Sequence, residues 1–123
     1  MKILFAEDNE IFRKSLSFYL EGQGFTVHQF DNGEEAIEFL RMITVDLIIT
    51  DLNMPSIGGM EMINIVRNDL NMQIPIIVLT SSGMEETELD AFSMGANEFI
   101  SKPFSPQVLK ARIEKLLRQS TIR

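Results

Sequence analysis

Two unbroken apolar runs constrain the fold of this 123-residue chain more than any other feature of its sequence. They are Leu47-Ile48-Ile49 and Ile76-Ile77-Val78-Leu79, and each is followed directly by a threonine. A strand with one face in water alternates apolar and polar residues, whereas a strand covered on both faces does not. The runs therefore predict a parallel β-sheet with helices on both of its faces.

Apolar runs of strand length alternate with segments of helical period along the whole chain. The predicted strands are residues 3–6, 26–29, 46–50, 76–80 and 98–101. A segment with the pattern of a helix follows each of them, which is the signature of a repeated βα unit. The sequence therefore predicts an α/β fold built on a doubly wound five-stranded parallel sheet.

The predicted helices carry recognisable start signals and apolar stripes. In the first, Phe12, Leu16 and Leu20 recur at every fourth position, and Asn9 is placed to cap its start. The next three are predicted over about residues 33–42, from residue 59 onward, and over 86–94. The last opens at Ser105-Pro106, and its predicted inward residues are Val108, Ile113, Leu116 and Leu117.

Length and composition point to one folded domain, predicted over residues 1–119 with a short tail at 120–123. No stretch approaches the roughly 18 apolar residues that cross a bilayer, and no signal-peptide pattern opens the chain. We therefore expect no membrane association and a cytoplasmic location. The sequence has no cysteine, which excludes a disulfide scaffold, a thiolate metal site and a cysteine nucleophile.

The net charge of -7 opposes binding to nucleic acid and suits a basic protein surface or a metal cation. Basic residues nevertheless gather toward the carboxyl end, at Lys110, Arg112, Lys115, Arg118 and Arg123. Because Glu114 lies among them, we interpret them as a solvated helix face and expect no nucleic-acid partner.

The predicted strand ends collect polar residues at one edge of the sheet, where ligands bind in doubly wound folds. They are Glu7, Asp8, Asp51, Thr80 and Lys102. Three carboxylates about 4 to 6 Å apart repel one another by a few kcal/mol per pair, so such a site needs a cation. An all-oxygen set of this kind suits Mg²⁺.

Several of these residues also have a purely structural interpretation. Asp8 has the residue type of a helix cap, Thr80 is a common way to finish a strand, and Lys102 before Pro103 is compatible with a solvated loop. Asp51 is the exception, because an unpaired acid that closes a buried strand costs free energy unless it has a partner.

At this point the residues resemble a known family, the receiver domain of two-component response regulators, in order and over nearly the whole chain. The resemblance lies in Glu7-Asp8, in residues 51–55 with Gly58-Gly59 behind them, in Thr80-Ser81, in Gly95-Ala96 and in residues 99–104. It implies the flavodoxin-like (βα)5 receiver fold. Glu7 departs from the family, which more often has aspartate there.

The resemblance implies that Asp51 accepts a phosphoryl group from a histidine kinase or a phosphotransfer protein. It also implies that Glu7, Asp8, Asp51 and the backbone carbonyl of Asn53 hold Mg²⁺, while Lys102 contacts the phosphoryl oxygens. Such chemistry consists mostly of positioning and charge neutralisation. The chain is then not an enzyme acting on an external substrate, because it catalyses only its own phosphorylation and dephosphorylation.

The same resemblance assigns a switch and a docking surface. Thr80 is expected to move toward the phosphoryl group, and Phe99 to fill the space behind it. The expected docking surface for the phosphodonor is Phe12, Ser15, Pro103 and Phe104, although core packing is the competing interpretation of Phe12. The peptide bond between Lys102 and Pro103 is expected to be cis.

Three other functions share features with this sequence. One is a phosphorelay intermediate that passes the phosphoryl group onward, and another is an independent Mg²⁺-dependent phosphohydrolase. The third is a flavodoxin-like FMN carrier, whose phosphate the acids after the first strand would repel. The cognate kinase and the downstream target protein are not specified by the sequence.

Overall fold

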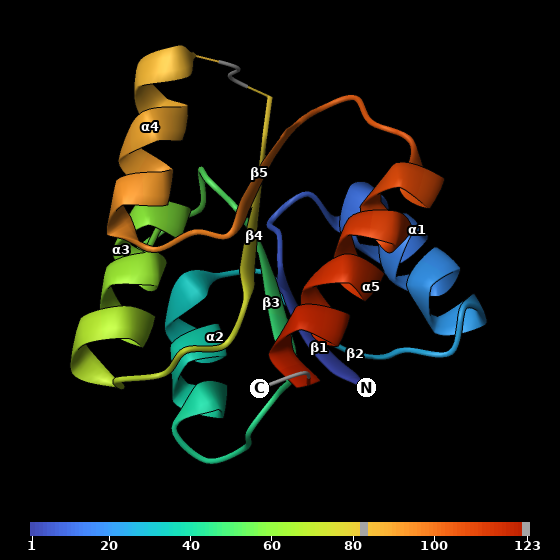
Figure 1. The fold of residues 1–123 in the computed structure, drawn as a ribbon, viewed down its shortest axis with the longest axis horizontal. Coiled ribbons are helices and arrows are strands. Elements are labelled where there is room, and N and C mark those ends of the chain that lie inside the picture. Colours follow the sequence, from blue (N-terminus) through green and yellow to red (C-terminus); the bar gives the residue numbers. More distant parts are fainter. Residues whose placement is uncertain (82–83, 122–123) are drawn as a thin grey trace.

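The structure, a computed structural model, describes residues 1–81 and 84–121. Its centre is one parallel sheet with the strand order β2-β1-β3-β4-β5 (Figure 1). The strands are β1 (Lys2–Ala6), β2 (Thr26–Phe30), β3 (Leu47–Asp51), β4 (Ile76–Thr80) and β5 (Glu98–Ser101). The predicted α/β fold with a five-stranded doubly wound sheet is confirmed.

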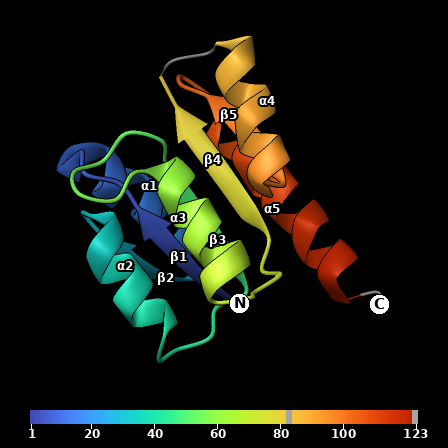
Figure 2. The same cartoon turned by 90° about the vertical axis from the view of Figure 1, so that its left-hand side faces the viewer.

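Helices cover both faces of this sheet. Helices α1 (Glu10–Gly22) and α5 (Pro106–Thr121) lie on one face. The other face carries α2 (Gly33–Leu40), α3 (Gly59–Asn64) and α4 (Glu85–Met94), as Figure 2 shows. The third helix continues as a π-helical segment, η1 (Ile65–Asp69), which the apolar pattern did not predict.

The apolar runs fill a separate core on each face of the sheet. Successive residues of a strand point to opposite faces, so in β3 Ile48 packs toward α2 and α3 while Ile49 packs toward α1 and α5. Every residue of β3 and β4 is buried. The unbroken runs are therefore explained by burial on both sides.

The helix predictions hold in outline and differ in detail. Asn9 caps α1, because its Oδ1 accepts a hydrogen bond of 3.0 Å from the amide of Phe12. In α5 the prediction that Val108 points inward is wrong, because Val108 is 46% exposed while its neighbour Leu109 is fully buried. Helix α5 also continues to Thr121, two residues into the segment predicted as a tail; residues 122 and 123 lie outside the described part.

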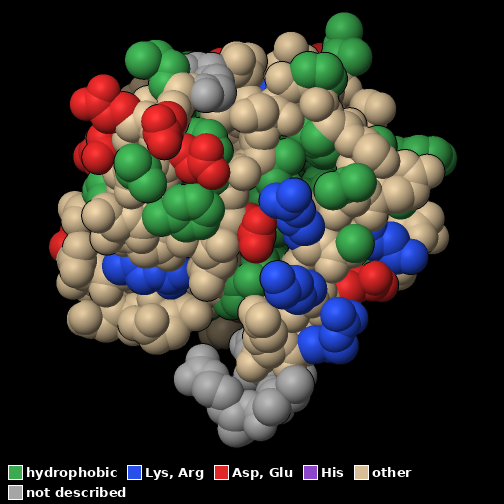
Figure 3. All heavy atoms as spheres, turned by 45° about the horizontal axis from the view of Figure 1, so that its top comes forward, with side chains coloured by type: hydrophobic (Ala, Val, Ile, Leu, Met, Phe, Trp, Pro, Cys, Tyr) green, Lys and Arg blue, Asp and Glu red, His purple; other side chains and the backbone are tan. Residues whose placement is uncertain are grey.

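Lys and Arg side chains gather over α5, and acidic side chains gather over α4 (Figure 3). Basic side chains of α5 have acidic partners among the described residues. Arg112 lies 2.9 Å from Glu98 of β5, and Lys110 lies 3.9 Å from Glu114. Within residues 1–81 and 84–121, no helix has both the length and the apolar character needed to cross a membrane.

Candidate functional site

The carboxyl ends of β1 and β3 bring three acids together. The two strands pair in parallel with Ala6 opposite Thr50, so the residues that follow, Glu7 and Asp51, reach the same edge of the sheet. One carboxylate oxygen from each of Glu7, Asp8 and Asp51 lies within 4.8 Å of the others. Glu7 and Asp51 are buried, whereas Asp8 is exposed and opens the cluster to solvent.

Asp51 is the last residue of β3 and is only 7% exposed. Its Oδ2 accepts a hydrogen bond of 3.2 Å from the backbone amide of Asn53, and its Oδ1 lies 3.0 Å from Nζ of Lys102. The amide of Leu52 donates to the carbonyl of Leu79 in β4, which carries the strand pairing one residue past Asp51. The carboxylate is thus fixed on a rigid strand rather than on a loop.

Lys102 follows β5 and projects its ammonium into the acid cluster. Its Nζ lies 2.8 Å from Oε1 of Glu7 as well as 3.0 Å from Asp51, and its backbone amide donates to the carbonyl of Thr80 at 2.7 Å. Burial lowers the pKa of Lys102, but the hydrogen bonds to Glu7 and Asp51 and the charges of these two acids together outweigh burial and raise that pKa. The amine therefore carries its charge. As the resemblance implied, the peptide bond between Lys102 and Pro103 is cis.

Glu7 is 1% exposed and held on several sides. Its Oε2 accepts the backbone N–H of Asn9 at 3.1 Å, and its Oε1 accepts the ammonium of Lys102. Burial raises the pKa of Glu7, and the nearby Asp51 adds to the rise. The bonds from Lys102 and Asn9 lower the pKa but do not cancel the burial effect. The single ammonium of Lys102 is shared between Glu7 and Asp51, so it cannot neutralise both carboxylates.

The donor set fits a small divalent cation. Three carboxylates supply only oxygen ligands, which suits Mg²⁺ or Ca²⁺ rather than a metal that prefers nitrogen or sulfur. Asn9 rather than Asp8 caps α1, so the structural interpretation of Asp8 as the cap is wrong. Its carboxylate belongs to the acid cluster.

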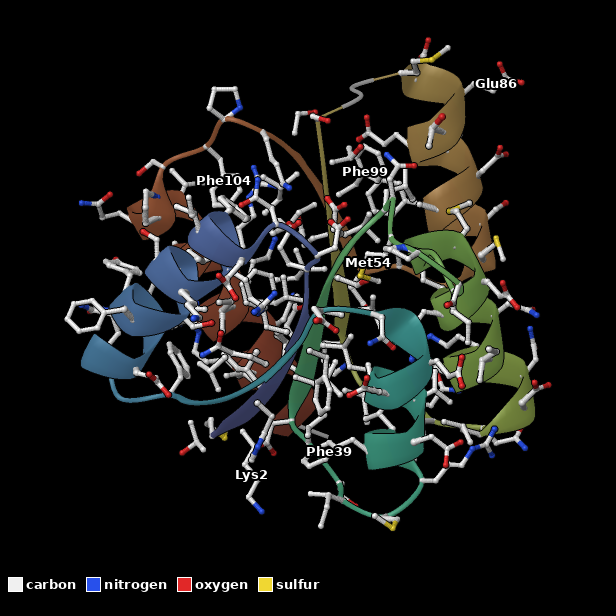
Figure 4. The ribbon with its side chains drawn as sticks, turned by 180° about the vertical axis from the view of Figure 1, so that it is seen from behind. Lys2, Phe39, Met54, Glu86, Phe99 and Phe104 are labelled. Atoms are coloured by element: carbon white, nitrogen blue, oxygen red, sulfur yellow. The ribbon has the colours of Figure 1, made fainter. Side chains whose placement is uncertain are left out.

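The predicted switch residues lie on the two neighbouring strands. Thr80 is fully buried at the end of β4, opposite Ser101 of β5. Phe99 is 7% exposed and packs in the core on the α2–α4 side of the sheet, together with Ala91 of α4. Figure 4 shows Phe99 close to α4.

The residues predicted as a docking surface fall into two groups. Phe12 and Phe104 are half-buried, and their rings meet edge to face at 6.0 Å; in Figure 4 Phe104 lies beside α1. Ser15 and Pro103 are exposed. The structure thus joins α1 to the loop after β5 through the two aromatic residues.

Two contacts at the site were not predicted from the sequence. Arg13 of α1 is buried, and its Nη1 donates to the carbonyl of Glu7 at 2.8 Å. Its spacing from the apolar residues of α1 places Arg13 on the inward face of the helix, so the sequence contained a signal for its burial. The second is the ring of Phe12, whose centroid lies 4.4 Å from Nζ of Lys102; nothing in the sequence reports such a contact between residues this far apart.

A family model described as the response regulator receiver domain matches residues 3–114. The transcriptional regulatory protein SrrA of Staphylococcus aureus is 35% identical over 119 residues, which is 97% of this chain. The chain spans 48% of the length of SrrA.

Solved structures of similar size superpose closely. The receiver domain of the Francisella response regulator 1452 matches with a TM-score of 0.93 at 25% identity and covers 98% of both chains. The signal receiver domain of a histidine kinase from Syntrophus aciditrophicus has a TM-score of 0.89 at 31% identity, over 99% of this chain and 93% of that one. The chemotaxis response regulator CheY4 of Vibrio cholerae has a TM-score of 0.86 at 29% identity, over 94% and 97%.

Proposed function

The chain belongs to the response regulator receiver domain family, and we propose that Asp51 is its phosphoacceptor. The observation that carries the proposal is the position of the Asp51 carboxylate. It closes a buried strand, touches the Lys102 ammonium at 3.0 Å and shares a cluster with Glu7 and Asp8. This is where positive charge can neutralise a transferring phosphoryl group.

The reaction proposed is phosphoryl transfer from a phosphohistidine of a histidine kinase or phosphotransfer protein. An Asp51 oxygen forms a bond to phosphorus while the bond from phosphorus to the imidazole nitrogen breaks, and the electron pair stays on that nitrogen. Hydrolysis later returns the Asp51 carboxylate and releases inorganic phosphate. Lys102 lies 3.0 Å from the Asp51 carboxylate, so its ammonium is placed to meet the phosphoryl oxygens as Asp51 is modified. In this proposal the chain catalyses only its own phosphorylation and dephosphorylation.

A bound Mg²⁺ would neutralise phosphoryl charge in this reaction. Glu7, Asp8 and Asp51 are the proposed protein ligands, together with the backbone carbonyl of Asn53. The all-oxygen donor set of three acids, which share the one ammonium of Lys102, supports this assignment.

The proposal extends to signalling. Thr80 and Phe99 are the proposed switch, supported by their burial on adjacent strands. Phe12, Ser15, Pro103 and Phe104 are proposed to receive the phosphodonor, and an unidentified target protein reads the switched state. Onward transfer in a phosphorelay stays an alternative, and the expected cytoplasmic location stays a prediction.

The test is phosphorylation by acetyl phosphate with Mg²⁺, followed by mass spectrometry of the intact protein. We expect one added phosphoryl group on the wild type and none on Asp51→Asn. Asp46→Asn, which changes the acid just before the same strand, should be modified like the wild type. Unchanged modification of Asp51→Asn would show that the phosphoacceptor is another residue. Steady turnover of a phosphomonoester would favour the phosphohydrolase instead.

A further inference from the structure

Among the described residues, the Lys102 ammonium contacts two acids and one aromatic ring. Its Nζ lies 2.8 Å from Glu7, 3.0 Å from Asp51 and 4.4 Å from the centroid of the Phe12 ring. A cation over the face of an aromatic ring is attracted by the negative charge of that face. The side chain of Lys102 is 21% exposed, so the attraction is only partly screened by water.

The ring contact differs from the other two because it does not depend on the reacting atoms. When Asp51 forms a bond to phosphorus, the carboxylate that holds Lys102 changes its charge and shape. When a cation binds, the charge of Glu7 is shared with it. The face of Phe12 stays as it was, so it can hold the ammonium while Lys102 exchanges a carboxylate for a phosphoryl oxygen.

The Phe12 ring is itself held in place. It meets Phe5, which is fully buried in β1, at 6.4 Å and an interplanar angle of 72°. It meets Phe104 at 6.0 Å and 89°. Its backbone amide donates the capping hydrogen bond to Oδ1 of Asn9. A ring that packs against two other aromatic rings, on a capped helix turn, is a firm support for a lysine, whose long side chain loses conformational entropy when it is ordered.

We propose that Phe12 is a positioning residue for phosphoryl transfer, whose ring holds the Lys102 ammonium over the acid cluster as the phosphoryl group arrives. The inference rests on the proposed function and adds a residue to it. It differs from the docking interpretation of Phe12, because a docking residue has no effect on a donor too small to touch α1. It differs from simple core packing, because packing does not require a ring.

The experiment compares Phe12→Leu, which removes the ring but keeps an apolar side chain, with Phe12→Tyr, which keeps the ring. The control is Phe18→Leu, the same change on the same helix at a position 81% exposed. Phosphorylation by acetyl phosphate is followed at saturating Mg²⁺. We expect the maximal rate of Phe12→Leu to fall by about 5- to 30-fold. Phe12→Tyr and Phe18→Leu should stay within about twofold of the wild type, and the Mg²⁺ affinity should be unchanged in all of them.

Two further measurements separate positioning from a loss of packing. In a Lys102→Ala background, Phe12→Leu should cause no additional loss of rate, because its effect passes through the lysine. In metal-free protein, the Lys102 side-chain protons next to Nζ should be shifted upfield by the ring in wild type and Phe12→Tyr. That shift should vanish in Phe12→Leu, and Lys102→Arg identifies the signal.

The outcomes are distinct. If the wild type is phosphorylated and Phe12→Leu is phosphorylated at the same rate, the role of Phe12 is overturned but the proposed function is not. The role of Phe12 would also be overturned if Phe12→Leu lowered the phosphorylation rate further in the Lys102→Ala background. Such a loss would indicate a structural defect. A wild type that takes up no phosphoryl group would overturn the proposed function, and the role of Phe12 with it.

Discussion

Gly59 lies so close to Asp51 that a Cβ on Gly59 would come within 2.7 Å of the Asp51 carbonyl oxygen and 2.9 Å of the Leu52 Cα. Both neighbours are backbone, which cannot move aside as a flexible side chain can. The first residue of α3 therefore packs directly against the end of β3. Glycine at this position lets the strand deliver Asp51 where the other two acids are.

Gly59→Ala should consequently destabilise the protein by about 1–3 kcal/mol, the usual cost of overpacking, and should slow phosphorylation of Asp51 as the strand end shifts. Urea denaturation and the acetyl phosphate assay measure the two effects. Gly22→Ala is the matched control, because a Cβ there meets no atom within 4 Å. It should raise stability by about 0.4–1 kcal/mol. Equal stabilities for the two variants would contradict the steric argument.

The acid cluster predicts a trade between stability and metal binding. Asp8→Asn removes one of three crowded negative charges, so the metal-free variant should be more stable than the wild type by on the order of 1 kcal/mol. It should also gain less thermal stability from Mg²⁺, because binding to the folded state is what raises the melting temperature. Thermal unfolding with and without Mg²⁺ tests both. Asp69→Asn, an exposed acid of η1, should change neither, and an Asp8→Asn variant that responds to Mg²⁺ like the wild type would refute the ligand assignment.

The raised pKa of Glu7 predicts a pH dependence in metal-free protein. The folded state holds the Glu7 proton more tightly than the unfolded chain does. In the unfolded chain the pKa of this carboxyl is about 4.5. The stability that this carboxyl contributes is therefore complete below pH 4.5 and is lost as the pH rises through the folded-state pKa. Glu7→Gln keeps an oxygen for Lys102 but has no such loss.

Stability relative to the wild type should thus shift in favour of Glu7→Gln as the pH rises from 4.5 toward neutrality. Urea denaturation at several pH values, with a chelator present, gives the difference at each pH. A difference that stays constant, or that moves in favour of the wild type, would mean that the pKa of Glu7 is not raised by folding.

The sequence specified the strands better than the helices, for a physical reason. A strand buried on both faces must be apolar throughout, so the run at residues 76–80 marks its own boundaries. A helix shows only one face to the core, and two adjacent apolar residues leave its phase ambiguous. Val108 and Leu109 are such a pair, and the inward member proved to be Leu109.

The same distinction holds for the site: positions set by the strands were predicted, whereas contacts set by side-chain direction were not. Residues at the strand ends were found because parallel strands end at a common edge, which places Glu7 beside Asp51 without any knowledge of side chains. Contacts that depend on side-chain direction were missed, as with Arg13, whose guanidinium turns back to the Glu7 carbonyl. A charged residue at an inward helix position was the available clue. The contact of Phe12 with Lys102 has no counterpart in sequence spacing.

Thr80 and Phe99 supply a prediction about switching. Thr80→Val keeps the shape of the side chain but removes the hydroxyl that would bond a phosphoryl oxygen, so phosphorylation of Asp51 should continue while its structural consequence is lost. The ring signals of Phe99 in NMR spectra, with and without beryllofluoride, report that consequence. Thr80→Ser keeps the hydroxyl and should retain the wild-type response. A full response in Thr80→Val would remove Thr80 from the switch.

Arg67 joins the end of the third helix to the start of β5. Its Nε and Nη2 donate to the carbonyl of Gly95 at 3.1 and 2.8 Å, and its Nη1 donates to the carbonyl of Met72 at 2.9 Å. Nη2 also reaches Oδ1 of Asn97 at 3.0 Å. The planar guanidinium makes all of these bonds from one position, and it does so from the π-helical segment η1.

Arg67→Lys should therefore cost about 1–3 kcal/mol of folding free energy, because a single ammonium cannot reproduce the forked geometry and leaves partly buried carbonyls without a donor. Urea denaturation measures the loss. Asn68→Ala is the neighbouring control: it removes only an exposed bond to Asn64 and should change stability by less than about 0.5 kcal/mol. If the lysine variant were as stable as that control, the bonds to Gly95 and Met72 would not contribute to stability. Because Lys102 follows β5, the same variant should also slow phosphorylation of Asp51.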